Sequence, residues 1–377
     1  MKAVASLRLT VVCLSLAMVL IFAGTLDQVN LGIHEVQKKY FQSIFVFWQV
    51  PGSTWKLPVL PGGYLLGGVI LLNLITAHAV RFRCSWKKLG LLTAHAGLII
   101  LLLGELGSGM LSQESQMRLN EGEAKDYSED MRHTELAVID TTNPNYDQVT
   151  AIPEAVLRKT QQIKHPSLPF SIRVQRFMKN SRLALRTEAP PDWPPATVTA
   201  GLGKQLAVIE VPQATKMDER DISTALLEID VENSTETWLV SNVLPEPQSF
   251  SCNGRTFTLI LRQKRFYRPF SIQLLDFQHE RYPGSDIPKN FSSRIHLVHL
   301  EQHEDREYLI YMNHPLRYSG LSFFQAGFEN DDQTSILQVV QNPVWLIPYI
   351  SCLLISLGLT FQFAMHLCGF ISRRTPL

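Results

Sequence analysis

The chain has 377 residues, and its 35 lysines and arginines nearly balance its 34 aspartates and glutamates. The resulting net charge of +1 argues against a nucleic-acid-binding protein, which needs clustered basic charge. Hydrophobic residues make up 45% of the sequence, and they are concentrated in four blocks. A long and more polar region separates the third block from the fourth.

Each apolar block is long enough to cross a bilayer, because about 20 mainly apolar residues span the hydrocarbon core as a helix. The sequence therefore predicts a membrane protein with four transmembrane α-helices and both termini on one side. The predicted segments are transmembrane helices at 1–26, 64–80, 89–110 and 343–366, an outer loop at 27–63, a cytoplasmic loop at 81–88, an extracytoplasmic domain at 111–342 and a cytoplasmic tail at 367–377.

Positive charge predicts the orientation. The start of the chain, the loop 81–88 and the tail 367–377 carry basic residues and no acidic ones. Short basic segments remain on the cytoplasmic side of a membrane. The loop 27–63 and the region 111–342 are therefore predicted to lie outside, in the periplasm of a bacterial cell. Alternatively, the first block is a cleaved signal peptide that ends near Ala23, which would leave the other three helices in place.

The region 111–342 has the pattern of a β domain. In "RTFTLIL" (255–261) and "FSIRVQRF" (170–177), apolar residues alternate with polar ones. Such period-two runs, separated by turn-forming residues, are typical of a β-sandwich or barrel. Proline clusters at 190–195 and 245–247 predict loops or a seam between subdomains, and residues 216–228 predict one short helix.

The outer loop 27–63 begins with an amphipathic helical pattern and then becomes aromatic, with Tyr40, Phe45 and Trp48. Aromatic residues favour the membrane interface, so this segment is interpreted first as an interfacial anchor. The alternative is one wall of a binding site for a flat, apolar ligand.

Cys252 is the only cysteine of the predicted outer domain, so that domain cannot form an internal disulfide. The chain has no CxxC motif, which argues against a thioredoxin-like redox role, and no CxxCH motif, so it is not itself a c-type cytochrome. Cys252 is interpreted as a buried or idle thiol.

The third block carries a glycine stripe and a histidine. Gly90, Gly97 and Gly104 recur every seven residues, and small residues let helices approach closely in lipid. This stripe is predicted to pack on another helix of the chain. His95 is two residues from Gly97, about 200° around the helix, so it should point nearly away from the stripe.

A histidine within a membrane helix usually faces a partner, a cavity or a cofactor. A neutral imidazole surrounded by leucines suits heme, which is apolar and binds iron through such a nitrogen. A hydrogen bond to a neighbouring helix and a proton relay are the alternatives. His78 is a weaker candidate for a second heme ligand, or it reaches toward the interface. His296, His299 and His303 are interpreted as surface residues rather than a metal cluster.

Four stretches together resemble the ResB (also called CcsB) family of System II cytochrome c biogenesis. The first is "TLDQVNLGIHEVQKKYFQSIF", which follows the first span. The second is the pair "LPGGYLLGGVILLNLITAHAVRF" and "LGLLTAHAGLIILLLGELGSG", in the second and third spans. The third is "RPFSIQLLDFQHERYPGSDIPKNFSS" in the outer domain, and the fourth is "YMNHPLRYSGLSFFQAGF", which precedes the last span. They occur in this order and include all four apolar blocks or their flanks. Residues 135–250 carry no diagnostic match.

The resemblance implies that the chain works with a CcsA/ResC-like membrane protein, carrying heme b across the cytoplasmic membrane for attachment to apocytochrome c. It also implies that His95 is the transmembrane heme ligand, paired with a histidine of the partner. The family's tryptophan-rich motif belongs to that partner, and the six tryptophans here are scattered. The chain is therefore expected to be a non-catalytic subunit of a holocytochrome c synthase.

Two other functions are considered. A membrane-anchored β-domain scaffold would recruit partners without binding heme. A transporter complete in itself is disfavoured, because only four spans and few intramembrane polar groups are predicted.

Overall fold

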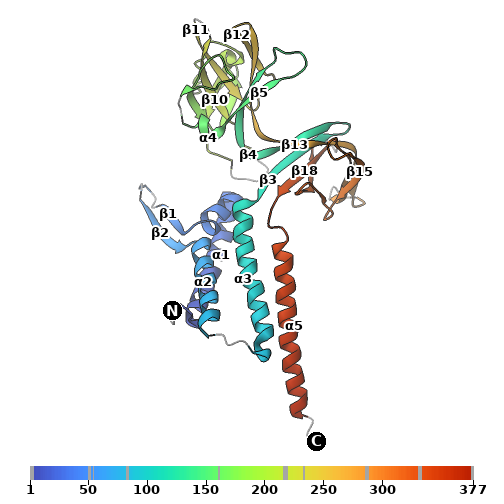
Figure 1. Ribbon diagram of the computed structural model, residues 1–377. Helices are drawn as coiled ribbons and strands as arrows, with labels where there is room; N and C mark the ends of the chain where they lie inside the picture. Colours follow the sequence, from blue (N-terminus) through green and yellow to red (C-terminus); the bar gives the residue numbers. More distant parts are fainter. Residues whose placement is uncertain are drawn as a thin grey trace. The chain divides into compact units, whose positions relative to one another are not determined.

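The computed structural model describes residues 4–49, 52–53, 55–81, 85–159, 162–214, 220–231, 234–284, 288–329 and 333–374. The chain forms two compact units (Figure 1). The helical unit is built mainly from Met1–Gln113 and Gln341–Leu377, and the β unit from Glu114–Ala214 and Asp218–Val340. The predicted fold class is confirmed, because four membrane-length helices are present and a mainly-β domain lies between the third and the fourth.

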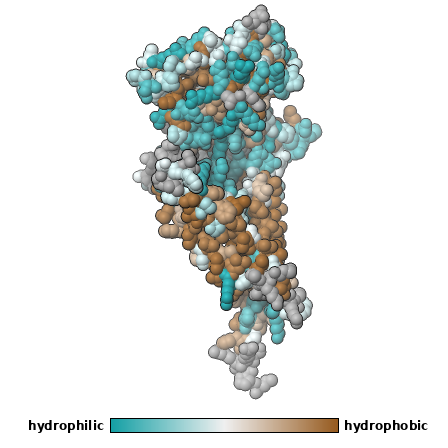
Figure 2. Space-filling view, turned by 90° about the vertical axis from the view of Figure 1, so that its left-hand side faces the viewer, coloured by the Kyte–Doolittle hydropathy of each residue, from teal (hydrophilic) through white to brown (hydrophobic). Residues whose placement is uncertain are grey.

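The long helices of the helical unit are α1 (Leu7–Val36), α2 (Gly63–Arg81), α3 (Leu89–Leu111) and α5 (Ile347–Arg374). Each is long and apolar enough to cross a membrane. Large apolar side chains cover their outer surfaces, and this unit is mostly brown in the view of Figure 2. A continuous apolar surface of this extent requires lipid rather than water around it.

α1 extends to Val36, well beyond the predicted end of the first span. It bends at Gly32, where φ is 72°, a backbone conformation that glycine adopts at little cost. The π-helical turn η1 (Gln37–Phe41) follows. Lys39 Nζ and Tyr40 Oη both donate hydrogen bonds to Oδ2 of Asp27, at 2.6 and 2.7 Å. These two bonds hold the turn against the end of α1.

The aromatic part of the loop forms a hairpin of β1 (Phe45–Gln49) and β2 (Lys56–Pro61). Val46 is buried against Leu20, Val36, Tyr40 and Leu66 in a small apolar core. The hairpin is therefore attached to α1 and α2 through its first strand, while most of its other side chains are exposed.

A buried amide joins α1 to α2. Asn73 on α2 is 5% exposed. Its Nδ2 donates to the carbonyls of Val4 and Ser6, and its Oδ1 accepts from the hydroxyl of Thr10 at 2.8 Å. A polar side chain within hydrocarbon is tolerated when its partners lie on a neighbouring helix.

The glycine stripe of α3 packs against α5. A Cβ atom added to Gly90 would lie 2.5 Å from the carbonyl oxygen of Gly358, and one added to Gly97 would lie 2.8 Å from Cγ1 of Ile355. A Cβ atom on Gly104 would collide with Ile347. The two backbones are therefore too close for any larger residue at these positions, which confirms the predicted packing role of the stripe.

The β unit contains one ten-stranded sheet, in the order β15-β14-β13-β4-β3-β18-β17-β16, with β12 beside β13 and β5 beside β4. A four-stranded sheet has the order β11-β10-β7-β6, and β8 pairs with β9. The strands are β3 (Gln113–Asn120), β4 (Ala124–Asp140), β5 (Gln148–Pro153), β6 (Gln162–Ile163), β7 (Ile172–Met178), β8 (Ser181–Leu185), β9 (Leu206–Glu210), β10 (Thr224–Val231), β11 (Ser234–Ser241), β12 (Gln248–Cys252), β13 (Arg255–Arg281), β14 (Pro288–His299), β15 (Glu304–Tyr311), β16 (Leu316–Tyr318), β17 (Leu321–Glu329) and β18 (Thr334–Gln341).

The long strand β13 contributes to two separate hydrophobic cores. Phe257 and Leu259, at odd positions, are buried in the first core with the four-stranded sheet. Ile272 and Leu274, at even positions, are buried in the second core. Between these parts, the pairing of β13 with β4 shifts register twice. Because side chains alternate between the faces of a strand, such irregularities change which positions face a core.

The helix predicted at 216–228 is wrong where the structure describes it. Thr224–Val231 forms β10, which lies between β11 and β7. Ala225, Leu227 and Ile229 are fully buried in the first core, so tertiary packing outweighs the helical preference of this alanine- and leucine-containing segment. Residues 216–219 lie outside the described residues.

The two proline clusters are in loops, as predicted.

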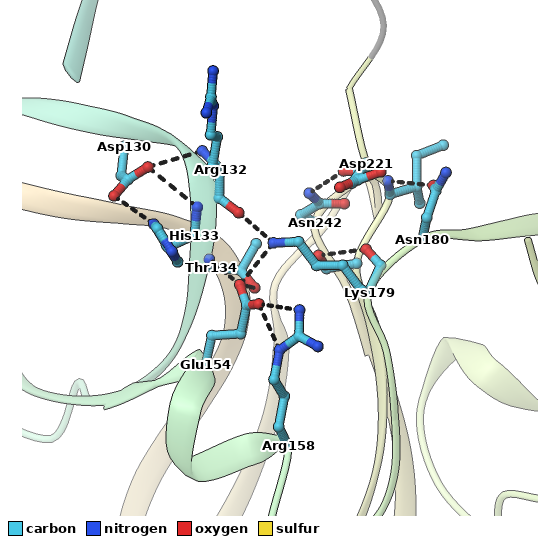
Figure 3. A network of polar contacts seen from close by, with 12 residues as sticks. Asp130, Arg132, His133, Thr134, Glu154, Arg158, Lys179, Asn180, Asp221 and Asn242 are labelled. Atoms are coloured by element: carbon cyan, nitrogen blue, oxygen red, sulfur yellow. Dashed lines mark hydrogen bonds and ion pairs between the residues drawn. The ribbon is translucent and has the colours of Figure 1, made fainter. Parts of the chain in front are cut away.

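A buried carboxylate connects three segments of the β unit (Figure 3). Glu154 begins the short helix α4 (Glu154–Leu157) and is 6% exposed. Its Oε2 accepts from Lys179 Nζ at 2.8 Å and from the backbone N–H of Thr134 at 2.9 Å. Its Oε1 accepts from Arg158 at 2.7 Å. Burial by itself raises the pKa of Glu154, but the bonds from Lys179 and then the other donors outweigh it and lower that pKa.

Replacing Gly97 with alanine is expected to loosen the α3–α5 contact, because the new methyl group meets Ile355 and the carbonyl oxygen of Ser351 at 2.9 Å or less. Overpacking of this kind costs about 1–3 kcal/mol. We expect a lower thermal midpoint for the detergent-purified variant, followed as loss of the monodisperse size-exclusion peak. The control is Gly67→Ala on α2, where nothing lies within 4 Å and the midpoint should not fall. Equal midpoints for both variants would contradict the packing role.

The Glu154 network predicts an acid-sensitive β unit. A lowered folded pKa means that ionised Glu154 stabilises the fold above the unfolded pKa of about 4.3, and that this contribution disappears as the pH falls through the folded pKa. We expect Glu154→Gln to unfold more easily at pH 7, by about 1–3 kcal/mol, and to lose less stability in acid than the wild type. Urea denaturation followed by tryptophan fluorescence measures both effects, since Trp238 is buried in the first core.

The matched control for this prediction is Glu210→Gln, because Glu210 pairs with Arg176 at 2.7 Å while both side chains are about half exposed. Exposed ion pairs contribute at most about 1 kcal/mol. A Glu154→Gln variant that behaves like Glu210→Gln at every pH would show that the network does not stabilise the fold.

Candidate functional site

The two histidines singled out in the helical unit lie in direct contact. His78 is close to the end of α2, and His95 is in the second turn of α3. Nδ1 of His95 is 3.0 Å from Nε2 of His78, and the two rings are nearly perpendicular at 89°. Nδ1 of His78 is in turn 2.8 Å from the backbone carbonyl oxygen of Leu74, one helical turn earlier.

The short connection between α2 and α3 explains why these residues meet. α2 ends at Arg81 and α3 begins at Leu89, so the helices run in opposite directions through the same apolar layer. His78 precedes the end of α2 by about one turn, and His95 follows the start of α3 by nearly two turns. The pairing could have been anticipated from the sequence, because both histidines lie within two helical turns of the short connection between α2 and α3.

His95 lies on the side of α3 that is not packed on α5, as predicted. Its neighbours on that helical face include Leu91 and Leu98, which are 39% and 37% exposed. Among the described residues, no group forms a hydrogen bond with Nε2 of His95, and this atom is not among the buried polar atoms without a partner. The chain therefore leaves one imidazole nitrogen accessible on an apolar surface.

This arrangement fits the chemistry of heme. A neutral imidazole nitrogen binds heme iron, and an apolar surface suits the porphyrin ring. The side chain of His95 provides the nitrogen, while the leucines of its helical face provide the apolar surface. A polar atom that faces hydrocarbon without a partner is costly, so a ligand or a second protein is the expected occupant.

The histidines of β14 and its following turn do not form a metal site. His296 and His299 face opposite sides of the strand, and His296 lies 2.5 Å from Oδ1 of Asp305. His299 is only 2% exposed, so its assignment to the surface is wrong. Phe270 and Tyr318 cover His299, and Tyr318 Oη is 2.7 Å from its Nδ1. The residues next to His299 in the sequence do not indicate this cover, because Phe270 and Tyr318 come from other strands. Among the described residues, no three His, Cys, Asp or Glu side chains cluster as metal ligands.

The outer hairpin borders an open cleft of about 850 Å³ in the helical unit. Its lining combines aromatic and basic side chains: Lys39, Ser43, Ile44, Phe45, Phe47, Trp48, Gln49 and Lys56. Both an interfacial anchor and one wall of a ligand site remain predictions for this segment.

Cys252 is 2% exposed in the first core of the β unit, which confirms that its thiol is buried.

Comparisons with known proteins agree with the resemblance drawn from the sequence. Residues 243–336 match the model of the ResB-like family. Protein NrfI of Wolinella succinogenes is 38% identical over 94 residues, which are 25% of this chain and 10% of that protein. The chain thus matches only about a tenth of the length of this relative. The part of the chain from just before β12 into β18 is therefore similar to the ResB-like family.

Proposed function

We propose that this protein is a membrane subunit of cytochrome c biogenesis that carries heme across the membrane together with a CcsA/ResC-like partner. The observation that carries this proposal is the accessible Nε2 of His95 on an apolar helix face. The similarity of residues 243–336 to the ResB-like family supports the same process. Heme b is the cargo in this proposal, and apocytochrome c is its final acceptor.

His95 contributes one ligand in this proposal, and a histidine of the partner contributes the second. His78 does not supply the second ligand in this proposal, because its Nε2 lies 3.0 Å from Nδ1 of His95. The partner's tryptophan-rich region holds the heme when the thioether bonds form. This chain is therefore the subunit that receives and positions heme rather than the catalytic one.

The proposed location is the cytoplasmic membrane, with both termini in the cytoplasm. The basic loop 81–88 supports this orientation, because short basic segments stay on the cytoplasmic side. His95 then lies near the cytoplasmic side of the bilayer, where newly made heme is available. The β unit is placed outside, where apocytochrome c is located.

A scaffold without heme is the second candidate. The family match covers residues 243–336, which belong to the β unit and include neither His78 nor His95. This observation favours a function centred on the β unit, such as recruitment of the partner or of apocytochrome c. The two candidates differ in whether His95 is needed.

The deciding experiment is an absorption spectrum of the full-length protein purified from membranes with its CcsA-like partner. We expect a Soret band in the wild type, and its loss in His95→Gly. Added imidazole should restore the band, because it supplies the missing ligand. The control is His366→Gly on α5, an exposed histidine whose Nε2 is 3.0 Å from Nε2 of Gln362, which should keep the band.

A wild-type complex that matures cytochrome c and never contains heme would overturn the conduit and support the scaffold. An undiminished Soret band in His95→Gly would show that residues other than His95 bind the heme. Size-exclusion profiles that match the wild type establish that each variant is folded.

A further inference from the structure

We propose that His78 is a positioning residue that sets the tautomer of His95 and directs Nε2 of His95 toward a ligand. The identity of the ligand rests on the proposed heme function, whereas the hydrogen-bond relay itself involves only residues of this chain. The relay runs from the Leu74 carbonyl through His78 to His95.

The direction of the relay follows from its first member. A backbone carbonyl oxygen only accepts hydrogen bonds, so Nδ1 of His78, at 2.8 Å from the Leu74 oxygen, must carry the proton. A charged imidazolium is costly in hydrocarbon, so His78 is neutral and its Nε2 holds a lone pair. The tautomer of His78 is therefore determined by its own helix.

The second step transfers this constraint to His95. Nε2 of His78 accepts, so Nδ1 of His95, 3.0 Å away, must donate. In a neutral imidazole, the other nitrogen then has the lone pair. Nε2 of His95 is consequently ready to bind a metal, without the rearrangement that the opposite tautomer would require.

The same distance argues against His78 as the opposite axial ligand in this arrangement. A metal–imidazole bond is about 2 Å long, so nitrogens on the two faces of one heme lie about 4 Å apart. The two facing nitrogens here are 3.0 Å apart and are joined by the hydrogen bond itself. A histidine that binds a metal usually donates its other ring N–H to a carboxylate or a carbonyl oxygen. His78 takes the place of that acceptor for His95. An imidazole acceptor keeps this support uncharged within the membrane.

The relay can be tested first without heme, by ¹⁵N NMR of the full-length chain labelled at histidine. We expect the His95 signal, identified by its absence in His95→Gly, to show a protonated Nδ1 and an unprotonated Nε2. His78→Phe should shift it to a mixture of tautomers. His78→Gln should retain the wild-type pattern, because the glutamine oxygen can also accept. A His95 signal that is unchanged in His78→Phe would overturn the relay.

Hemin titration of the same variants, in complex with the partner, supplies the second readout. Loss of a supporting hydrogen bond typically lowers metal affinity by 10–100-fold, so we expect that decrease for His78→Phe and near wild-type affinity for His78→Gln. The axial-ligand spectrum should remain that of the wild type in both. A changed spectrum in His78→Phe that added imidazole restores would make His78 a ligand and overturn the positioning role.

The two proposals fail in different ways. Wild-type affinity and an unshifted tautomer in His78→Phe, with heme lost in His95→Gly, would remove only the relay. A shifted tautomer in His78→Phe, with heme binding unaffected by His95→Gly, would leave the relay in place and remove heme ligation by His95.

Discussion

The close approach of α3 to α5 is the constraint from which the arrangement of the candidate site follows. Gly90, Gly97 and Gly104 leave no room for a side chain between these helices, so this side of α3 is committed to α5. Residues on the opposite side must face α2, lipid or another protein. His95 is on that side, and its contact with His78 follows from the short loop that joins α2 to α3.

The helical unit therefore has two kinds of helix contact with different physical origins. α3 and α5 meet through backbone and small residues, where van der Waals packing in lipid is most effective. α2 and α3 meet near their loop through two imidazoles, and α1 and α2 meet through Asn73. Polar contacts of this kind are directional, so they determine register and orientation rather than only holding helices together.

The features predictable from the sequence were those that depend on local periodicity. The four spans, the glycine stripe and the alternating strands around Phe257 and Ile172 each repeat at the period of one element, and each is found in the structure. Features that depend on distant residues were missed. Residues 224–228 contain good helix formers, yet their strand lies between two others. The burial of His299 depends on Tyr318 from another strand. The hydrogen bond between His78 and His95 could not be predicted either, because the spacing of residues in a sequence does not give the distances between ring nitrogens.

The helical unit is also discontinuous along the chain, and this has a consequence for how the protein is made. α3 ends at Leu111, and its partner α5 begins only at Ile347, after the whole β unit. At the usual pace of about 5–20 residues per second, translation of the intervening segment takes on the order of ten to fifty seconds. During that interval the glycine stripe of α3 has no α5 to cover it, whereas α2 has already been synthesised. The contact between the two histidines can therefore form before the helical unit is complete, and insertion of the last helix completes a membrane unit in which this contact is already made.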